Sequence, residues 1–286
     1  MVAPVKIFLT STGAANWTVP ADWNDLNNSI EVIAGGGSGC AAGGGNYGGS
    51  GSGGAYSKIT NLALTKGALI PVNIGAGGAR AISTGGNILG NPGGDTWFGN
   101  ASYGGANVAA KGGLGGLTGP ISNTMGNILG GQASAGIGSI KYSGGGVPNA
   151  VISGVVTGAG GAAGPNGNGQ DGVSTGGTAY SGRAGGAGDN GLGGAGGAGG
   201  SSFTSGNGAD GTEFDATHGA GGGGGANCPN WLNVCTAGDG GKYGGGGGGG
   251  TNGGGYTNTS GKGGDGLIVI TYTPIPVSQS SMFLAM

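Results

Sequence analysis

Glycine pairs separated by a single small residue recur along this chain, and they set a period of three residues. Residues 193–200 read Gly-Gly-Ala-Gly-Gly-Ala-Gly-Gly, and glycine makes up 85 of the 286 residues. Glycine loses more conformational freedom on folding than any other residue, so such a chain needs many backbone partners in order to fold. A polyproline II-type helix has three residues per turn and directs its N–H and C=O groups sideways, toward neighbouring helices. The period therefore predicts an ordered bundle of glycine helices.

Disorder and collagen are the two competing interpretations of this glycine content. Disordered chains usually combine high charge with low hydrophobicity, whereas this chain has 9 basic and 11 acidic residues and several apolar runs of strand type. Collagen requires glycine at every third position and abundant proline, but here glycines are often adjacent and there are 10 prolines. The composition therefore favours polyglycine II helices, packed side by side.

The first third of the chain and its last strong apolar run are typical of β-strands. We expect the run at 266–272 to pair with the amino-terminal strands and to complete their sheet, because it is too apolar to be left exposed. The other strand candidates are residues 5–10, 17–20, 29–34, 55–60 and 69–74, with 95–99 and 107–111 as the arms of a hairpin.

The glycine tracts of the central region predict straight rods joined by loops. The tracts are residues 112–119, 158–164, 185–200, 219–225 and 244–250. Side chains at every third position form columns, and we expect the columns with Leu114, Leu117 and Leu192 to face an inner seam. Asp239 and Lys242 are expected to face water.

The predicted fold class is mainly β, with little or no α-helix. An amino-terminal β-sandwich is closed by the carboxyl-terminal strand and carries a long inserted bundle of polyglycine II helices. The expected domains are an anchoring sandwich (1–111 plus 264–273), a glycine-rich domain with presenting loops (112–263) and an apolar tail (274–286).

No catalytic or metal-binding pattern stands out. His218, the one histidine, has no cysteine or serine signature beside it, and Asp210, Glu213 and Asp215 lack the spacing of a calcium loop. Residues 35–37 follow a strand as a phosphate loop does, but the Gly-Lys-Ser/Thr ending is missing. The sequence therefore predicts a protein that is not an enzyme and uses no cofactor or metal.

The charge and the apolar runs also exclude several partners. The formal net charge is −2, and Arg80 and Arg183 lie far apart, so no basic patch for nucleic acid is expected. No apolar run approaches the roughly 20 residues that cross a bilayer, so no membrane insertion is expected. Lys6 precedes an apolar stretch too short for a secretory signal, which indicates synthesis in a cytoplasm.

The three cysteines leave at least one thiol unpaired within the chain. Cys228 and Cys235 bracket a loop of six residues that a disulfide could tie, whereas Cys40 lies far away. A disulfide between Cys228 and Cys235 and two plain buried thiols both remain open, because the redox compartment is unknown.

Aromatic residues beside glycine are the candidate binding residues. Rigid aromatic side chains on loops supply contact area at low entropic cost, as recognition surfaces commonly do. They could equally fill gaps at the ends of the glycine rods. The candidates for receptor contact are Phe203, Phe214, Trp231, Tyr243 and Tyr256.

Four segments in combination resemble the glycine-rich domains of bacteriophage tail and fibre proteins. They are Trp17-Thr18-Val19-Pro20, residues 30–37 (Ile-Glu-Val-Ile-Ala-Gly-Gly-Gly), residues 93–99 (Gly-Gly-Asp-Thr-Trp-Phe-Gly) and the ending at 263–272. The chain is similar, more loosely, to the polyglycine II receptor-binding adhesins of long tail fibres, in which variable distal loops contact the bacterial surface. It departs from them by beginning directly with strands, so the resemblance does not support a dedicated fibre-attachment domain.

The resemblance implies a virion protein of the tail fibre or tail tip that binds a host-cell surface receptor, a protein or a glycan, through loops on a glycine scaffold. Its expected partners are other virion proteins, as a homo-oligomer or attached to a fibre. One alternative is a structural virion protein without receptor binding, such as a capsid decoration, head fibre or connector, for which the apolar tail provides a docking segment. A more distant alternative is an ice-binding protein.

Overall fold

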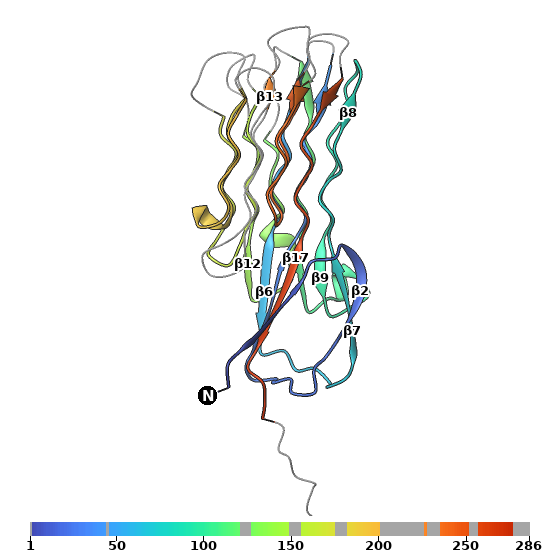
Figure 1. Cartoon of the computed structure of the whole chain (residues 1–286), viewed down its shortest axis with the longest axis vertical. Coiled ribbons are helices and arrows are strands. Elements are labelled where there is room, and N and C mark those ends of the chain that lie inside the picture. Colours follow the sequence, from blue (N-terminus) through green and yellow to red (C-terminus); the bar gives the residue numbers. More distant parts are fainter. Residues whose placement is uncertain are drawn as a thin grey trace, which may run out of the picture.

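The computed structural model is elongated, with a β-sandwich at one end and a bundle of extended segments at the other (Figure 1). The described residues are 2–43, 46–120, 127–148, 156–174, 182–200, 226–227, 235–251 and 257–276. Among them there are three short 3-10 helices and no α-helix, and strands predominate among the regular elements. The predicted fold class, mainly β, is confirmed.

Seventeen strands and three short helices are defined among the described residues. In chain order they are β1 Val5–Leu9, β2 Gly13–Thr18, β3 Asn28–Ile33, β4 Ala41–Ala42, β5 Asn46–Gly48, β6 Tyr56–Thr60, β7 Leu69–Ile74, β8 Ile82–Ser83, β9 Thr96–Phe98, η1 Tyr103–Gly105, β10 Val108–Ala110, β11 Thr118–Pro120, η2 Ala133–Ala135, β12 Ile140–Tyr142, η3 Asp189–Gly191, β13 Ala226–Asn227, β14 Cys235–Thr236, β15 Gly250–Thr251, β16 Asn258–Thr259 and β17 Leu267–Tyr272.

The carboxyl-terminal strand β17 is an interior strand, second from the edge, of a five-stranded sheet of order β1-β17-β3-β6-β12. It pairs antiparallel with β1, where Val5 is opposite Tyr272, and antiparallel with β3, where Ile33 is opposite Leu267. The predicted pairing of the last apolar run with the amino-terminal strands is therefore confirmed. Because β17 lies between β1 and β3, the five-stranded sheet is complete only once almost the whole chain has been made.

A four-stranded sheet of order β10-β9-β7-β2 packs on this sheet and completes the sandwich. The predicted hairpin is confirmed, because β9 and β10 pair antiparallel. The core between the sheets includes Ile268 and Ile270 of β17. It also holds aromatic pairs with ring centroids 5.1–5.6 Å apart, made by Trp17, Trp23, Phe98 and Tyr272.

The other face of the five-stranded sheet is also buried, by what we call the junction cluster. Its members are Ile33, Tyr56, Ala162, Ala163, Leu267 and Val269. Successive residues of β17 thus point alternately into the sandwich core and into the junction cluster, which explains why the strand is apolar at consecutive positions.

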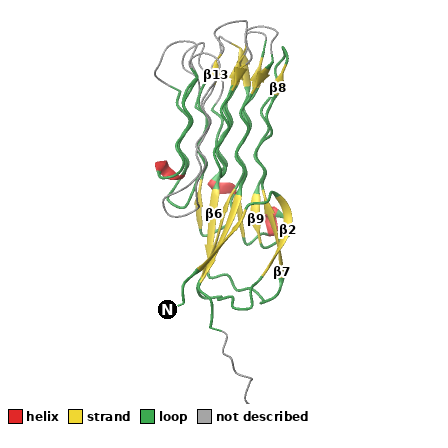
Figure 2. Cartoon of the chain, in the orientation of Figure 1, coloured by secondary structure: helices red, strands yellow, loops and turns green. Residues whose placement is uncertain are grey.

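Several sandwich strands continue directly into extended segments that run side by side away from the sandwich, and these segments form the bundle (Figures 1 and 2). β3 leads into residues 35–41 and β7 into residues 75–81, whereas residues 260–266 lead into β17. Segments of the bundle therefore arise within the first 111 residues as well as within the glycine-rich region. The sandwich and the bundle share strands and are not joined by a linker.

Lateral backbone hydrogen bonds hold the bundle together, and they repeat every third residue. In segment 35–41, the N–H groups of residues 35, 38 and 41 donate to segment 88–94, those of 36 and 39 to segment 261–264, and those of 37 and 40 to segment 49–52. Among the described residues, the carbonyl groups of this segment accept from three further stretches, at residue 78, at 113–116 and at 247–250. One segment is thus bonded to six neighbours, with the period that the glycine pairs predict.

The segments lie so close together that inner positions admit only very small residues. A Cβ atom at Gly37 would lie 2.0 Å from the carbonyl oxygen of Leu114, and one at Gly53 would lie 1.9 Å from that of Gly161. The larger side chains are therefore on the outside. The prediction that Leu114, Leu117 and Leu192 face an inner seam is wrong, since these side chains are 46–54% exposed.

Two parts of the glycine-rich region differ from the predicted rods and loops. Residues 185–200 form two antiparallel segments and not one rod, with Gly185 N–H donating to Gly197 O across the pair. Residues 139–156 lie between two of the tracts and so fall in a predicted loop, but they contribute β12, which pairs with β6 at the sheet edge. The first segment pairs within its own tract and the second pairs with a distant strand, and local composition reveals neither partner.

The turn between residues 188 and 194 is stabilised by a buried carboxylate. Asp189 accepts hydrogen bonds from the backbone N–H and the side-chain Nδ2 of Asn166, each 2.7 Å long. Burial raises the pKa of Asp189 despite these bonds. The same turn places Asn190 and Gly191 at positive φ.

We predict that Gly37→Ala destabilises the protein by about 3 kcal/mol, the upper end of the cost of overpacking, because the added methyl group meets the backbone of a neighbouring segment. Gly86→Ala is the matched control, since a Cβ atom there has no atom within 4 Å. The control should change stability by less than about 1 kcal/mol. Denaturant unfolding measures both values, and equal stability of the two variants would contradict this account of the bundle.

Candidate functional site

The distal end of the bundle, the end away from the sandwich, is built from very short strands (Figure 1). The β13-β15-β4 group pairs in parallel, and the β14-β16-β8 group lies beside it. Side chains add to these pairings: Asn258 Nδ2 donates to Ala42 O over 2.9 Å, and Gly48 N–H donates to Thr251 Oγ1 over 3.1 Å. The described backbone of the distal end is therefore held from several sides.

Large apolar side chains are exposed at and near this distal end. Ile82 belongs to β8, Ile88 bridges to Ala41 of β4, and Leu117 precedes β11. Together with Leu89 they are 45–58% exposed. Exposed apolar groups on a fixed backbone can contact a partner at little entropic cost. A signal in the sequence could have found these exposed residues. A bulky residue at one of the third positions of a glycine segment has no room inside the bundle, so its side chain must lie on the outside.

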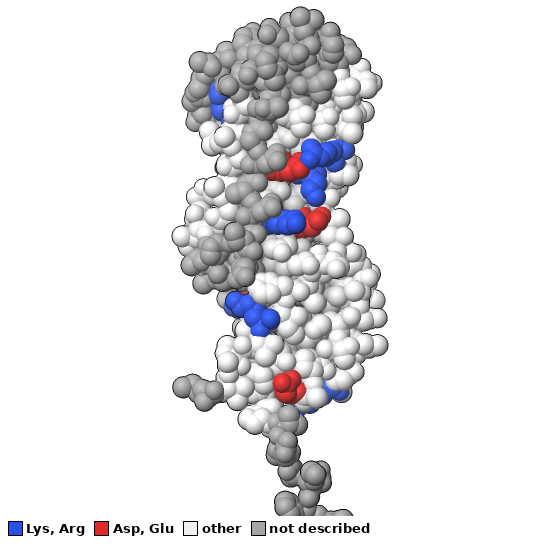
Figure 3. All heavy atoms as spheres, in the orientation of Figure 1, with Lys and Arg blue, Asp and Glu red and all other residues white. Residues whose placement is uncertain are grey.

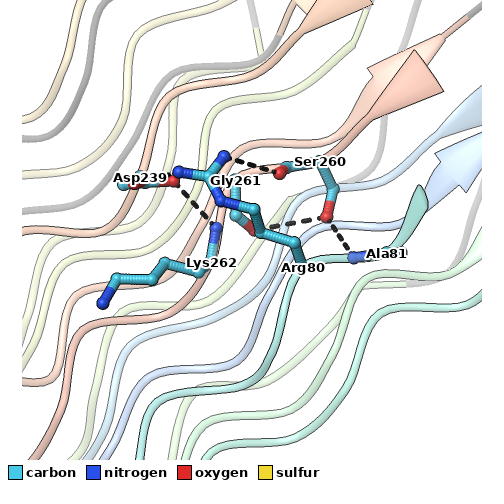
Figure 4. A network of polar contacts seen from close by, with 6 residues as sticks. All are labelled: Arg80, Ala81, Asp239, Ser260, Gly261 and Lys262. Carbon is cyan, nitrogen blue, oxygen red and sulfur yellow. Dashed lines mark hydrogen bonds and ion pairs between the residues drawn. The ribbon is translucent and has the colours of Figure 1, made fainter. Parts of the chain in front are cut away.

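The flank of the bundle carries a polar network that ties three segments together (Figure 4). Arg80 forms an ion pair with Asp239, and its Nη1 donates to the Ser260 carbonyl oxygen over 3.2 Å. Asp239 Oδ1 also accepts from the backbone N–H of Lys262 over 3.0 Å. Because both oxygens of Asp239 bond within the protein, this network stabilises the bundle and is not a candidate catalytic site.

Charge is sparse on the molecular surface. On the face shown in Figure 3 most of the surface that the described residues form is uncharged, and basic and acidic groups lie close together near its middle. The sandwich also has basic and acidic groups paired with each other, as Lys58–Glu31 at 3.1 Å and Lys111–Asp95 at 2.6 Å. Because opposite charges lie side by side in this way, the described residues form no extended surface of positive or of negative charge.

Four of the five aromatic candidates, Phe203, Phe214, Trp231 and Tyr256, lie outside the described residues. The fifth, Tyr243, is partly buried and packs against the junction cluster. Its placement agrees with the alternative in which these aromatics fill gaps at the ends of the glycine segments. Tyr243 therefore lies near the sandwich, and the structure does not bring it to the distal end.

The cysteines are similarly divided. Cys40 is fully buried and its thiol lies 3.3 Å from the carbonyl oxygen of Leu117. Burial raises the pKa of Cys40 to about 12. Cys228 lies outside the described residues, and only the backbone of Cys235 is described, so the possible disulfide between them stays a prediction.

The described residues contain neither a metal-ion cluster nor a membrane-spanning helix. Within the ranges given above, no group of three or more His, Cys, Asp and Glu residues is placed to hold a metal ion. Nor does any helix in the described part of the chain have the length and apolarity to cross a membrane.

The fold defines a class of protein: a β-sandwich whose strands extend into a laterally bonded glycine bundle. The chain belongs to the family described as the glycine-rich domain, whose model matches residues 10–273. This match covers both the sandwich strands and the bundle, so the two parts belong to one family unit. A comparison with curated proteins found no matching relative.

We predict that Cys40 does not react with iodoacetamide in the native protein, because its thiol is buried and protonated at mildly alkaline pH. The double variant Cys228→Ser/Cys235→Ser isolates this thiol for mass spectrometry. The same sample in denaturant, where Cys40 should react fully, is the control. Fast modification of the native variant would contradict the burial of Cys40.

Unreduced wild-type protein in denaturant reports on the other two cysteines. Modification of Cys40 alone would establish the disulfide between Cys228 and Cys235, whereas modification of all three cysteines would exclude it.

Proposed function

We propose that this protein is a bacteriophage virion protein of the tail fibre or tail tip that binds a host-cell surface receptor with the distal end of its bundle. The observation that carries the proposal is the position of the two ends of the described chain in the elongated molecule. β1 and β17 pair at the sandwich, and the backbone N–H of Ile275 donates to Asp22 O there. Both ends of the described chain thus lie at the sandwich, opposite the distal end (Figure 1).

This arrangement suits a protein that is attached to a larger particle at one end and binds its partner at the other. The sandwich, with its termini, would seat the protein among other virion proteins, as a homo-oligomer or on a fibre. The distal end of the bundle would be presented to the host. Binding residues are found disproportionately on loops that a rigid scaffold positions, and here the scaffold is bonded laterally along its length.

Membership of the glycine-rich domain family supports the scaffold part of the proposal. The assignment to a phage virion rests on the resemblance of the four sequence segments given above. The low and balanced charge is consistent with a cell-surface receptor and unlike the basic surface of a nucleic-acid-binding protein.

One observation favours a second function, a structural virion protein without receptor binding. Leu89, Leu114 and Leu117 are 46–55% exposed on neighbouring segments of the bundle. Apolar side chains exposed along a flank suit docking on a neighbouring virion protein, as a capsid decoration or connector would require.

We predict that the double variant Trp231→Ala/Tyr256→Ala lowers adsorption to host cells by about tenfold or more, because aromatic side chains dominate the binding energy of many interfaces. Its melting temperature should stay near that of the wild type. Phe8→Ala is the matched control, since Phe8 is 40% exposed on β1 of the sandwich, and it should adsorb normally. The measurement is binding of purified, labelled protein to whole host cells.

Unchanged adsorption of the double variant would contradict the placement of the binding residues. Binding only to other virion proteins, with none to cells, would favour the structural alternative.

A further inference from the structure

A polar cleft of about 410 Å³ opens on the flank of the bundle, apart from the distal strands. It lies between residues 127–132, 143–148 and 168–171, which come from three extended segments and the turns beside them. Its volume is within the range of about 300–1,000 Å³ that small-molecule sites occupy. No part of the proposed receptor-binding role uses this cleft.

Three side chains that line the cleft are each fixed by one hydrogen bond to the backbone. Asp171 Oδ1 accepts from Gly146 N–H over 2.6 Å, and Asn168 Oδ1 accepts from Ser143 N–H over 2.9 Å. Gln132 Nε2 donates to Gly130 O over 2.7 Å. The bundle thus orients these side chains before any ligand arrives, which lowers the entropic cost of binding.

Each fixed side chain keeps a second polar atom for a ligand. Asp171 retains Oδ2 as an acceptor, Asn168 retains the Nδ2 donors, and Gln132 retains Oε1 as an acceptor. Ser143 Oγ accepts from Ala133 N–H over 3.0 Å and retains its own proton as a donor. Donors and acceptors are therefore both present in one small cleft, and vicinal hydroxyl groups can bond to both kinds.

Apolar groups complete the lining. Leu129 is 58% exposed, Pro148 is half-buried, and Val147 is buried beneath them. A sugar ring presents C–H groups on its faces and hydroxyl groups at its edge, so it can use both kinds of lining at once.

The charges of the cleft disfavour the other small-ligand classes. Among the described lining residues there is no lysine or arginine, and Asp171 is the one carboxylate. A phosphate or nucleotide would meet that carboxylate without a cation to compensate, and a metal ion would find too few acidic ligands. An apolar ligand would leave the polar side chains unpaired.

We propose that this cleft binds a short neutral saccharide, with Asp171 and Asn168 bonding its hydroxyl groups and Leu129 contacting its ring. Because the cleft is open and offers few contacts, the dissociation constant should be on the order of 1 mM. The inference does not depend on the proposed function, since a purified protein can bind a sugar whether or not it adsorbs to cells.

The test is a titration of the ¹⁵N-labelled full chain with glucose, galactose, N-acetylglucosamine and rhamnose, followed by amide chemical shifts. We expect at least one sugar to shift the resonances of Gly144, Gly146 and Gly169 saturably. Asp171→Ala and Asn168→Ala should weaken that binding about tenfold, the effect of losing one or two hydrogen bonds.

Two further variants keep the test independent of folding. Asp171→Asn can still accept from Gly146 N–H but replaces the second acceptor with a donor, so it should fold normally and still bind more weakly. Val173→Ala is the control, since Val173 is 40% exposed on the same segment outside the cleft lining and should leave binding unchanged.

The proposal is overturned if none of the four sugars causes saturable shifts at concentrations on the order of 100 mM. It is equally overturned if the Asp171 and Asn168 variants bind as the wild type does, or if inorganic phosphate shifts the same resonances more strongly. Sugar binding without adsorption to cells would refute the proposed function alone, and adsorption without sugar binding would refute the saccharide site alone.

Discussion

Lateral hydrogen bonding between backbones is the interaction on which the rest of this structure depends. Segment 35–41 donates to three neighbours and accepts from three more among the described residues, so its polar groups are satisfied although it belongs to no helix and mostly to no sheet. The hydrogen-bonded segments lie so close together that positions such as Gly37 have no room for a Cβ atom. The high glycine content is therefore a steric requirement of the bundle. The lateral hydrogen bonds of the bundle in turn offset the conformational entropy that glycine loses when it is ordered.

The sandwich supplies what the glycine segments lack, a core of large side chains. Its aromatic pairs and the apolar β17 fix which strands are neighbours, and those strands continue into the bundle with their register already set. The junction cluster extends this core over the outer face of the same sheet, where Ala162 and Ala163 of the bundle pack on Leu267 and Val269. Side-chain packing at one end therefore orders a bundle that has almost no side-chain core of its own.

The same steric rule decides where function can reside. Most inner positions hold glycine, alanine, serine or the buried Cys40, and few larger side chains, such as Val156, are buried among them. Most bulky and polar side chains therefore lie on the flank, in the turns and at the distal end. Leu117 and Ile82 are exposed for this reason, and Asp171 and Asn168 line a cleft on the flank. Any recognition surface on such a scaffold must be built from the few large residues that the glycine segments hold in fixed positions.

The sequence by itself determined the local character of the chain: most strands of the sandwich, the β9–β10 hairpin, the return of the last strand to the first, and the three-residue period of the bundle. Alternation, apolarity and glycine spacing are properties of residues that are neighbours in the sequence, so they can be recognised without knowing which segments pair in the fold. Only the tertiary structure decided that residues 185–200 fold back on themselves, that β12 joins the sheet edge, that Leu114 faces outward and that Tyr243 packs at the junction. Each of these outcomes depends on which segment of the chain lies alongside, and glycine, having no side chain, carries no information about that choice.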